Sequence, residues 1–372
     1  MMRARTCSVV MFCSLAFVAA CGSKAGQLFD STGGSAGLGG AGGNAASGGA
    51  GGSTEAGASS GGIAGAVTAG GSSGSPAGGA LGGGGEGGAG PSGTVLQSGS
   101  IAIPAFSMPN CQHVTFPSAF DASAAELRVL VTLVHPGSTN THNASAVWAQ
   151  AVSATGFDAC ITEDAGFDNE HPRSRIDWVA MVESAGPQLG LISRRQALSG
   201  AGEAQCQLLS VTGVTEPWHV QASLDVPSGG MQANRGTSLW FEQVAGSEAR
   251  LCARLLENAD GALAAASVDW VAYSASFARH GFTVGEHDFE SFNGTHCDTI
   301  ATGCAGCQNA QIRVNHRRRT ESATFTHGAT LAWVEDFDAA GQLTVCARET
   351  SAENNTHDAH MSVDWFVRQT ND

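Results

Sequence analysis

The chain is almost without lysine, since Lys24 is the single lysine among 372 residues. The formal net charge is −15, and the one basic cluster is 317–319 beside Arg313. A protein that binds nucleic acid usually presents a basic face, and an acidic surface repels DNA, anionic lipid and acidic glycans. The composition therefore argues against those partners and favours neutral ligands. We interpret the arginine cluster as the solvated side of a strand or turn.

Recognisable enzyme motifs are also missing. The chain has no H-E-x-x-H zinc motif, and no P-loop occurs in the part that can fold. One G-x-S-x-G match lies at 57–61, but its glycine-rich surroundings cannot make the strand, sharp turn and helix that this motif requires. We therefore predict a protein that is not an enzyme and uses no cofactor. Dispersed Asp and His residues that assemble an active site in space remain the alternative.

The apolar run from Val9 to Val18 is too short to cross a membrane as a stable helix. Its positively charged start and small-residue end predict an export signal over residues 1–21. The final Val-Ala-Ala-Cys resembles a bacterial lipobox, which implies acylation of Cys21, and Gly22 after it favours the outer membrane or cell surface. Several acyl chains anchor a protein stably. An ordinary secretory signal with a coincidental cysteine is the alternative.

Glycine is abundant, with 51 residues, and most of it precedes residue 100. Residues 22–95 consist mainly of Gly, Ala and Ser and show no periodic apolar face. Such a segment cannot bury a core, so we predict a disordered, flexible linker. At roughly 5–6 Å × √n, about 70 residues reach about 45 Å on average.

Three short segments beyond the linker are nearly identical and indicate a tandem repeat. Each contains an Asp-Trp pair, at 177–178, 269–270 and 364–365. The upstream spacing also recurs: Trp148, Cys160 and Trp178; Trp240, Cys252 and Trp270; Trp333, Cys346 and Trp365. We predict three modules at 96–186, 203–277 and 280–369, with residues 187–202 as a connector.

Short strand patterns bounded by turn residues fill each module, and no long helical pattern interrupts them. This favours an all-β fold of three tandem small antiparallel β-sandwich modules with about six strands each. In each closing strand the Trp face is the predicted core. The alternate residues Asp177, Asp269 and Asp364 are predicted to point outward and to pair with an arginine on a neighbouring strand, such as Arg254 or Arg348.

Eight cysteines remain after the signal, and an even number in an exported chain predicts disulfides. The repeat suggests the pairs Cys111–Cys160, Cys206–Cys252 and Cys307–Cys346, because each first cysteine precedes a glutamine. Cys297 and Cys304 then form a small loop. Each long disulfide would contribute about 3–4 kcal/mol in the chain-entropy model. The alternative is a zinc site of the C-x-x-C pair with Cys297 and nearby His287, His296 and His316; outside the cell we favour disulfides and predict no metal.

The first module resembles the H-type lectin domain in three segments, at 113–120, 155–160 and 176–180. The second and third modules share only the Trp-bearing closing strand, because 250–252 and 343–346 stand where the first module has Thr-Gly-Phe. The resemblance implies a six-stranded antiparallel sandwich that binds galactose or N-acetylgalactosamine without metal. Since family members form trimers, it also implies an intramolecular pseudo-trimer of the three modules.

The sugar-contacting residues of that family do not transfer to matching positions in this chain. Planar polar groups beside an aromatic ring suit a sugar site, so the loop before the closing strand is the nearest candidate. Asp168 and His171 carry this prediction in the first module, and Asn355 and His357 carry it in the third. The second module has no histidine there. Turn formation is the competing interpretation of the Asp and Asn residues.

Two functions follow as hypotheses. The first is a cell-surface lipoprotein that binds neutral carbohydrate or a glycoconjugate and touches the membrane only through its lipid. The second is a structural or adhesive surface protein whose β modules bind protein partners or each other.

Overall fold

The computed structural model describes residues 94–107, 109–135, 143–168, 170–198, 204–227, 235–259, 266–316, 329–351, 356–357 and 361–369. All of them belong to the compact unit that spans Gly84–Asp372. The predicted signal, Cys21, the linker before residue 94 and Asn355 lie outside the described residues. None of the helices in the described part of the chain has the length and apolar character needed to cross a bilayer.

The described elements are nearly all strands, so the predicted all-β class is confirmed. The first repeat holds β1 (Leu96–Ile103), β2 (Phe106–Ser107), β3 (Asn110–Thr115), β4 (Leu127–Val134), β5 (Ser145–Ser153), β6 (Gly156–Glu163), β7 (Glu170–His171) and β8 (Ser174–Val182). The second holds β9 (Leu191–Ala197), β10 (Gln205–Ser210), β11 (Trp218–Val226), β12 (Thr237–Ala245), β13 (Glu248–Leu255) and β14 (Ser267–Ser274). The third holds β15 (Phe282–Phe289), β16 (Phe292–Asn293), β17 (His296–Ala301), β18 (Cys307–His316), β19 (Thr330–Phe337), β20 (Gln342–Glu349), β21 (Thr356–His357) and β22 (Met361–Gln369).

The few described helices are short and lie between strands. They are η1 (Ala124–Glu126), η2 (Glu183–Ala185), α1 (Gly186–Leu189) and η4 (Ala275–His280). Helix α1 ends at Gly190, whose φ of 72° is the left-handed conformation that glycine adopts easily. The chain then enters β9, which pairs along its whole length with β14. The predicted connector at 187–202 is therefore wrong over Leu191–Ala197, which is a full strand of the second repeat.

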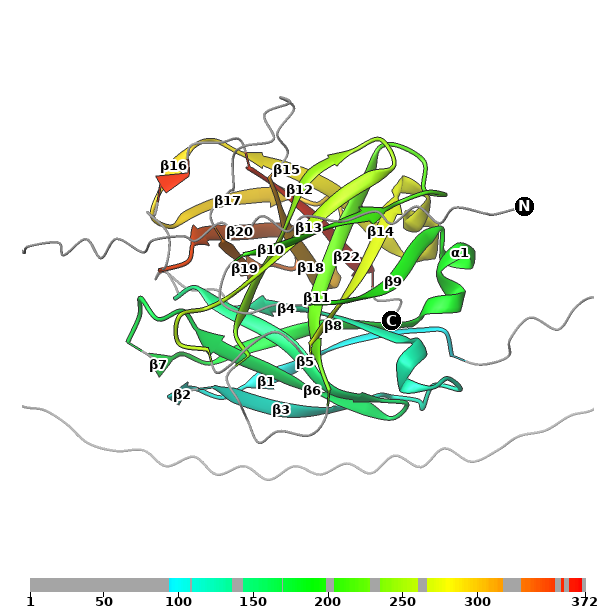
Figure 1. Ribbon diagram of the computed structural model, residues 1–372, viewed down its shortest axis with the longest axis horizontal. Coiled ribbons are helices and arrows are strands. Elements are labelled where there is room, and N and C mark those ends of the chain that lie inside the picture. Colours follow the sequence, from blue (N-terminus) through cyan, green and yellow to red (C-terminus); the bar gives the residue numbers. More distant parts are fainter. Residues whose placement is uncertain are drawn as a thin grey trace, which may run out of the picture. The chain divides into compact units, whose positions relative to one another are not determined.

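Three six-stranded sheets form the fold, and each takes three strands from one repeat and three from another. Figure 1 shows the three sheets, coloured by position in the sequence. Their strand orders are β1-β8-β4-β19-β20-β17, β3-β6-β5-β11-β14-β9 and β10-β13-β12-β18-β22-β15. The sharing is cyclic: the first repeat joins the second, the second joins the third, and the third joins the first.

Each join between repeats is a short parallel pairing, whereas strands within a repeat pair antiparallel. Strand β5 meets β11, β12 meets β18, and β19 meets β4. At the last join Val334 and Val134 are the one registered pair. The antiparallel prediction thus holds inside each repeat and fails at the three joins, where the paired strands run together briefly and then diverge.

The hydrophobic cores follow the same exchange. The core of the first repeat contains Trp333 and Cys346 from the third repeat. The core of the second repeat contains Trp148 and Cys160 from the first, and that of the third contains Trp240 and Cys252 from the second. Each tryptophan stands directly opposite its cysteine on the adjacent strand. No repeat completes its core from its own residues alone.

The closing strands are buried on both faces, which explains one success and one error of the sequence analysis. Trp178, Trp270 and Trp365 are almost fully buried, as predicted. Asp177, Asp269 and Asp364 are 0 % exposed instead of pointing outward. The suggested partners were Arg254 and Arg348, whereas the structure pairs Asp177 with Arg175, Asp269 with Arg195 and Asp364 with His219. The prediction of an outward face failed because that face packs against a strand of another repeat.

All eight cysteines are in disulfides, but two of the predicted pairs are wrong. Cys111–Cys160 and Cys206–Cys252 form as expected. The third repeat has Cys297–Cys346 and Cys304–Cys307 instead. Strand β17 with Cys297 pairs with β20, as β3 pairs with β6, whereas Cys307 opens β18, which pairs with β22. The shared Cys-Gln pair was a misleading signal. The sequence separation of 49, identical in Cys111–Cys160 and Cys297–Cys346, was the better one.

Candidate binding site at the Phe-His ribbon of the first repeat

Two small ribbons place a phenylalanine opposite a histidine. In the first repeat β2 pairs with β7 and sets Phe106 against His171. In the third repeat β16 pairs with β21 and sets Phe292 against His357. Strands β2, β7 and β16 all lie on the left in Figure 1, away from α1. Among the described residues the second repeat has no such ribbon.

Stacked rings form the floor of the first ribbon. The rings of Phe106 and His171 stack with centroids 5.1 Å apart and planes 14° from parallel. The ring of His135 also packs near His171, with the two ring centroids 5.1 Å apart. Both histidines are buried, whereas Phe106 is partly exposed. The exposed part of Phe106 therefore offers an apolar plate on a rigid support.

Planar polar groups from two segments meet beside β7: Asn143 lies just before β5, Glu163 ends β6, and Asp168 lies in the loop between β6 and β7. The Asn143 amide donates to the Glu163 carboxylate at 3.1 Å and lies 3.4 Å from the Asp168 carboxylate. Asp168 also accepts the backbone N–H of Glu170 at 3.0 Å. Asp168 is exposed and Asn143 is half-buried. Asp168 presents carboxylate oxygens and Asn143 presents an amide, and their hydrogen bonds to Glu170 and Glu163 hold these groups in place.

The other two repeats hold this loop in place. Asn258 of the second repeat donates its amide to the backbone carbonyl of Glu163 at 2.8 Å. Ser351 of the third repeat donates to the buried Asp164 carboxylate through its backbone N–H at 2.7 Å and its hydroxyl at 3.1 Å. The Arg348 guanidinium lies 4.6 Å from the centre of the Phe167 ring. Groups from all three repeats therefore converge on one loop.

Burial raises the pKa of Asp164, and the two hydrogen bonds from Ser351 oppose that rise. The carboxylate acts as a fixed acceptor that ties the loop to the third repeat. It does not face solvent, and we assign it no contact with a ligand. By fixing one end of the loop, Asp164 helps to hold the exposed Asp168 at the other end in a constant position.

The four predicted site residues differ in their exposure and in how much of them the structure describes. Asp168 is exposed beside Asn143, whereas His171 is buried and supports Phe106. Asn355 lies outside the described residues, and of His357 only the backbone in β21 is described. Sequence reasoning missed Phe106, Asn143 and Asn258. Phe106 was detectable in principle, because a Phe recurs five residues before the edge-strand cysteine in both repeats: Phe106 before Cys111 and Phe292 before Cys297.

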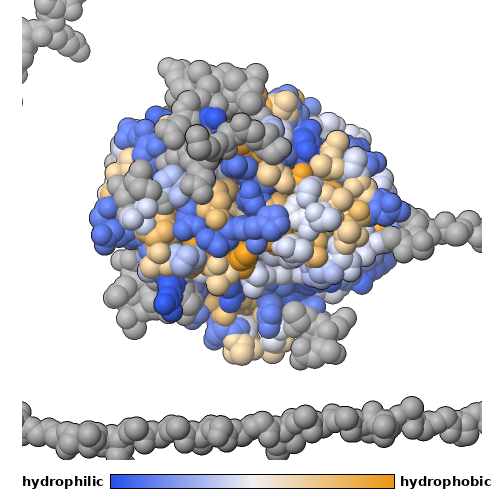
Figure 2. Space-filling view, turned by 90° about the horizontal axis from the view of Figure 1, so that it is seen from below, coloured by the Kyte–Doolittle hydropathy of each residue, from blue (hydrophilic) through white to orange (hydrophobic). Residues whose placement is uncertain are grey.

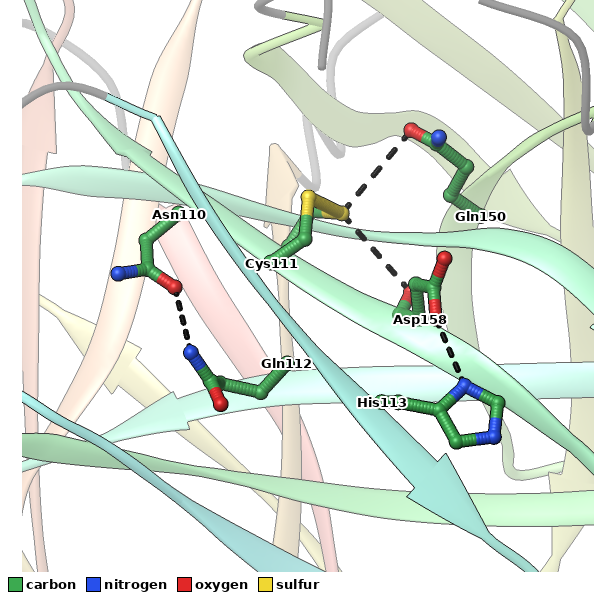
Figure 3. The surroundings of a disulfide bond; sticks show 7 residues. Asn110, Cys111, Gln112, His113, Gln150 and Asp158 are labelled. Atoms are coloured by element: carbon green, nitrogen blue, oxygen red, sulfur yellow. Dashed lines mark hydrogen bonds and ion pairs between the residues drawn. A yellow bond between two sulfur atoms is a disulfide. The ribbon is translucent and has the colours of Figure 1, made fainter. Parts of the chain in front are cut away.

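A second polar group surrounds the Cys111–Cys160 disulfide, which joins β3 to β6 in one of the six-stranded sheets. Figure 3 shows His113 pointing toward Asp158, and the two side chains lie 2.8 Å apart. Gln150 turns toward the disulfide, and Gln112 bonds to Asn110. His113 is exposed, and an exposed ion pair contributes little to stability or recognition. We therefore assign this group no role in ligand binding.

The histidines of the alternative zinc interpretation lie apart from any free thiol. His287 and His296 both bond to Asp298, at 2.9 Å and 3.2 Å. Cys297 and Cys304 are each committed to a disulfide. Since a zinc thiolate site needs deprotonated free sulfur, the residues of that proposed cluster do not form one.

Comparison of the chain with models of protein families, with curated proteins and with solved structures gives no match. The function is therefore inferred from the geometry of the described residues. Figure 2 shows a face on which hydrophilic and hydrophobic residues are interspersed. Among the described residues Leu208 is the one large hydrophobic side chain that is strongly exposed.

Proposed function

We propose that this protein is a surface-displayed lipoprotein that binds neutral carbohydrate of the galactose or N-acetylgalactosamine type. The observation that supports this most is that one short strand, β7, connects the two groups: His171 of β7 stands opposite Phe106, and the N–H of Glu170 in the same strand donates to Asp168, which lies beside Asn143. The resemblance of the first repeat to H-type lectins points to the same ligand class. The site needs no metal for this role.

The chemistry of a sugar fits these groups. A pyranose has an apolar face of C–H groups, which packs on an aromatic ring, and a rim of hydroxyls, which bond to planar carboxylates and amides. Asp168 accepts two such hydrogen bonds, and Asn143 both donates and accepts. An exposed carboxylate and a net charge of −15 disfavour acidic sugars.

The cyclic sharing of sheets supports a further part of the proposal, that the three repeats act as an intramolecular pseudo-trimer. Contacts from Asn258 and Ser351 onto the loop of the first repeat make its geometry depend on the other two. The first repeat is the proposed active one. The third retains the Phe-His pairing of its ribbon, and the described residues of the second contain no such ribbon.

The anchor is proposed from the sequence alone. The short apolar run that ends at Cys21 supports export and lipidation, and the Gly-rich segment after it supports a tether. Together they predict display of the β unit at the outer membrane or cell surface. Metabolic labelling with a palmitate analogue tests this part, and Cys21→Ser should abolish the label.

A glycan array with the purified protein tests the binding function. We expect signal on glycans that end in galactose or N-acetylgalactosamine, competed by the free sugar. Asp168→Asn should weaken binding roughly 10- to 150-fold, since a hydrogen bond to a charged group contributes about 1.5–3 kcal/mol. Asp121→Asn, an exposed carboxylate outside the cluster, is the matched control and should bind normally.

The competing function is a structural or adhesive surface protein that binds protein partners. Silence across neutral glycans, together with retained adhesion to cells or proteins, would favour it and reject the lectin. The scarcity of exposed large hydrophobic side chains among the described residues gives such a partner little apolar surface to bury.

A further inference from the structure

One buried position in the fold occurs three times with different electrostatic surroundings. Asp177, Asp269 and Asp364 each accept a backbone N–H from a strand of another repeat, at Ala310, Val129 and Val220. These three contacts are 2.8–3.0 Å long. The side chains around each carboxylate differ in charge: arginines surround Asp269, whereas a histidine and a glutamate lie beside Asp364.

At Asp269 the carboxylate is surrounded by positive charge. Arg195, directly opposite on β9, donates to it at 2.7 Å and 3.0 Å. The Arg128 guanidinium from β4 lies 3.9 Å away. The charge of the buried Asp269 carboxylate is therefore balanced by two arginines of the same chain, Arg195 and Arg128.

At Asp364 the corresponding positions carry different groups. Glu286 of β15 takes the place of Arg195, since it stands opposite Asp364 in register. His219 of β11 takes the place of Arg128, and its Nδ1 lies 3.1 Å from Asp364 Oδ1. Ligand atoms of His219, Glu286 and Asp364 all lie within 4.8 Å of one another. Two carboxylates and an imidazole thus converge where the related site places arginine.

We propose that His219, Glu286 and Asp364 bind a divalent metal ion of the zinc class at the junction of the second and third repeats. Imidazole with carboxylates is a ligand set that zinc accepts, with three protein ligands and a fourth position for water. Bond lengths of about 2.0–2.2 Å place ligand atoms of a tetrahedral site roughly 3.3 Å apart. His219 and Asp364 already have that separation.

Two features of the site make a cation useful there. Asp364 is 0 % exposed and His219 is buried, so a charge on the pair is poorly solvated. A metal ion would also join β11 of the second repeat to β15 and β22 of the third. The neighbouring cation on β18 is Arg313, which stands opposite Asp364 in register but forms no ion pair with any described residue.

Metal titration tests the proposal directly. The purified protein is treated with chelator and titrated with Zn²⁺ by calorimetry, and with Co²⁺ while the visible spectrum is recorded. We expect one strong site, no comparable site for Ca²⁺, and X-ray absorption of the zinc form that shows nitrogen and oxygen ligands without sulfur. Absence of a strong Zn²⁺ or Co²⁺ site would overturn the proposal.

Variants assign the site to these residues. Glu286→Gln and His219→Gln should each weaken the site more than about 100-fold, since losing even an outer-shell partner costs 10- to 100-fold. Glu290→Gln, an exposed glutamate just beyond β15, is the control and should bind like the wild type. Arg313→Met removes a repelling charge and should strengthen binding. Unchanged affinity in both ligand variants, Glu286→Gln and His219→Gln, would assign the metal to another part of the chain.

Discussion

The positions of Asp269 and Asp364 can be compared as two versions of one contact. Both carboxylates bond to a backbone N–H of a strand in another repeat, and both are fully buried. Asp269 has two arginines beside it, and Asp364 has a glutamate and a histidine. The comparison shows that the fold requires the carboxylate-to-backbone bond, whereas the charges around it are free to differ.

The joins between the sheets explain why the bond is required. Strands β4 and β19 pair only at Val134 and Val334 and then diverge. The N–H groups of Val129 and Val131 consequently lack a strand partner, and Asp269 and Ser223 supply the acceptors. A buried N–H without an acceptor is costly. Each aspartate therefore fills the gap where two sheets separate.

The largest expected effect is at Asp269. Asp269→Asn should lower the free energy of unfolding by about 3–5 kcal/mol, because it breaks a fully buried ion pair and leaves Arg195 with only Asp225 and Arg128 with only Glu183 as carboxylate partners. Asp364→Asn, measured in chelator, should cost only about 1–2 kcal/mol, because this carboxylate bonds to an imidazole and a backbone N–H and not to a guanidinium. Urea unfolding of both variants gives the two values. Equal losses would show that the arginines are not what distinguishes the two positions.

The third copy, Asp177, makes a prediction about pH. Burial raises its pKa to about 6, against the opposing charge of Arg175. A raised carboxyl pKa favours folding below the ordinary value near 3.9, and this contribution is lost as pH rises through 6. On the order of 3 kcal/mol is involved.

Asp177→Asn should therefore flatten the pH dependence of stability between pH 4 and 6. Unfolding free energies of the variant and the wild type across that range measure the change. Asp121→Asn, at an exposed carboxylate, serves as the control and should leave the slope unaltered. If the Asp177 variant keeps the wild-type slope, burial does not govern this carboxyl.

The smallest effect concerns the side chain next to each buried contact. Gln311 donates to the backbone carbonyl of Asp177 at 3.0 Å, and Gln221 donates to that of Asp364 at 2.7 Å. Leu130 stands at the corresponding position near Asp269. Gln311→Leu should cost about 1 kcal/mol in unfolding free energy. Gln308→Leu, at an exposed position of the same strand, is the control and should change the unfolding free energy little. A similar loss in both variants would mean that strand propensity, and not the hydrogen bond of Gln311, causes the effect.

Local patterns were sufficient for several features of this fold. Alternating residues around Trp178, Trp270 and Trp365 predicted strands with a buried Trp face, and short turns predicted an all-β class. An even cysteine count predicted disulfides, and all eight form them. Strand β4 is the instructive case: its sequence is apolar nearly throughout because both of its faces are buried.

The candidate site was only partly accessible from sequence. Asp168 was identified because Asp, Asn and His cluster before the closing strand. The roles of His171 as a support and of Asn258 as a contact from another repeat depend on the pairing of β2 with β7 and on the loop geometry. No spacing rule within one repeat places Asn258 beside Glu163, 95 residues away.

The amino-acid order alone determined that the chain forms strands, that they come in three similar sets, and which side of each closing strand carries tryptophan. Those properties follow from side-chain period and spacing within a few residues. The tertiary structure decided that sheets and cores are exchanged between repeats, that Cys297 rather than Cys307 bonds to Cys346, and that three aspartates are buried. These depend on contacts between strands far apart in the chain, such as the pair of Val134 with Val334, which local periodicity does not encode.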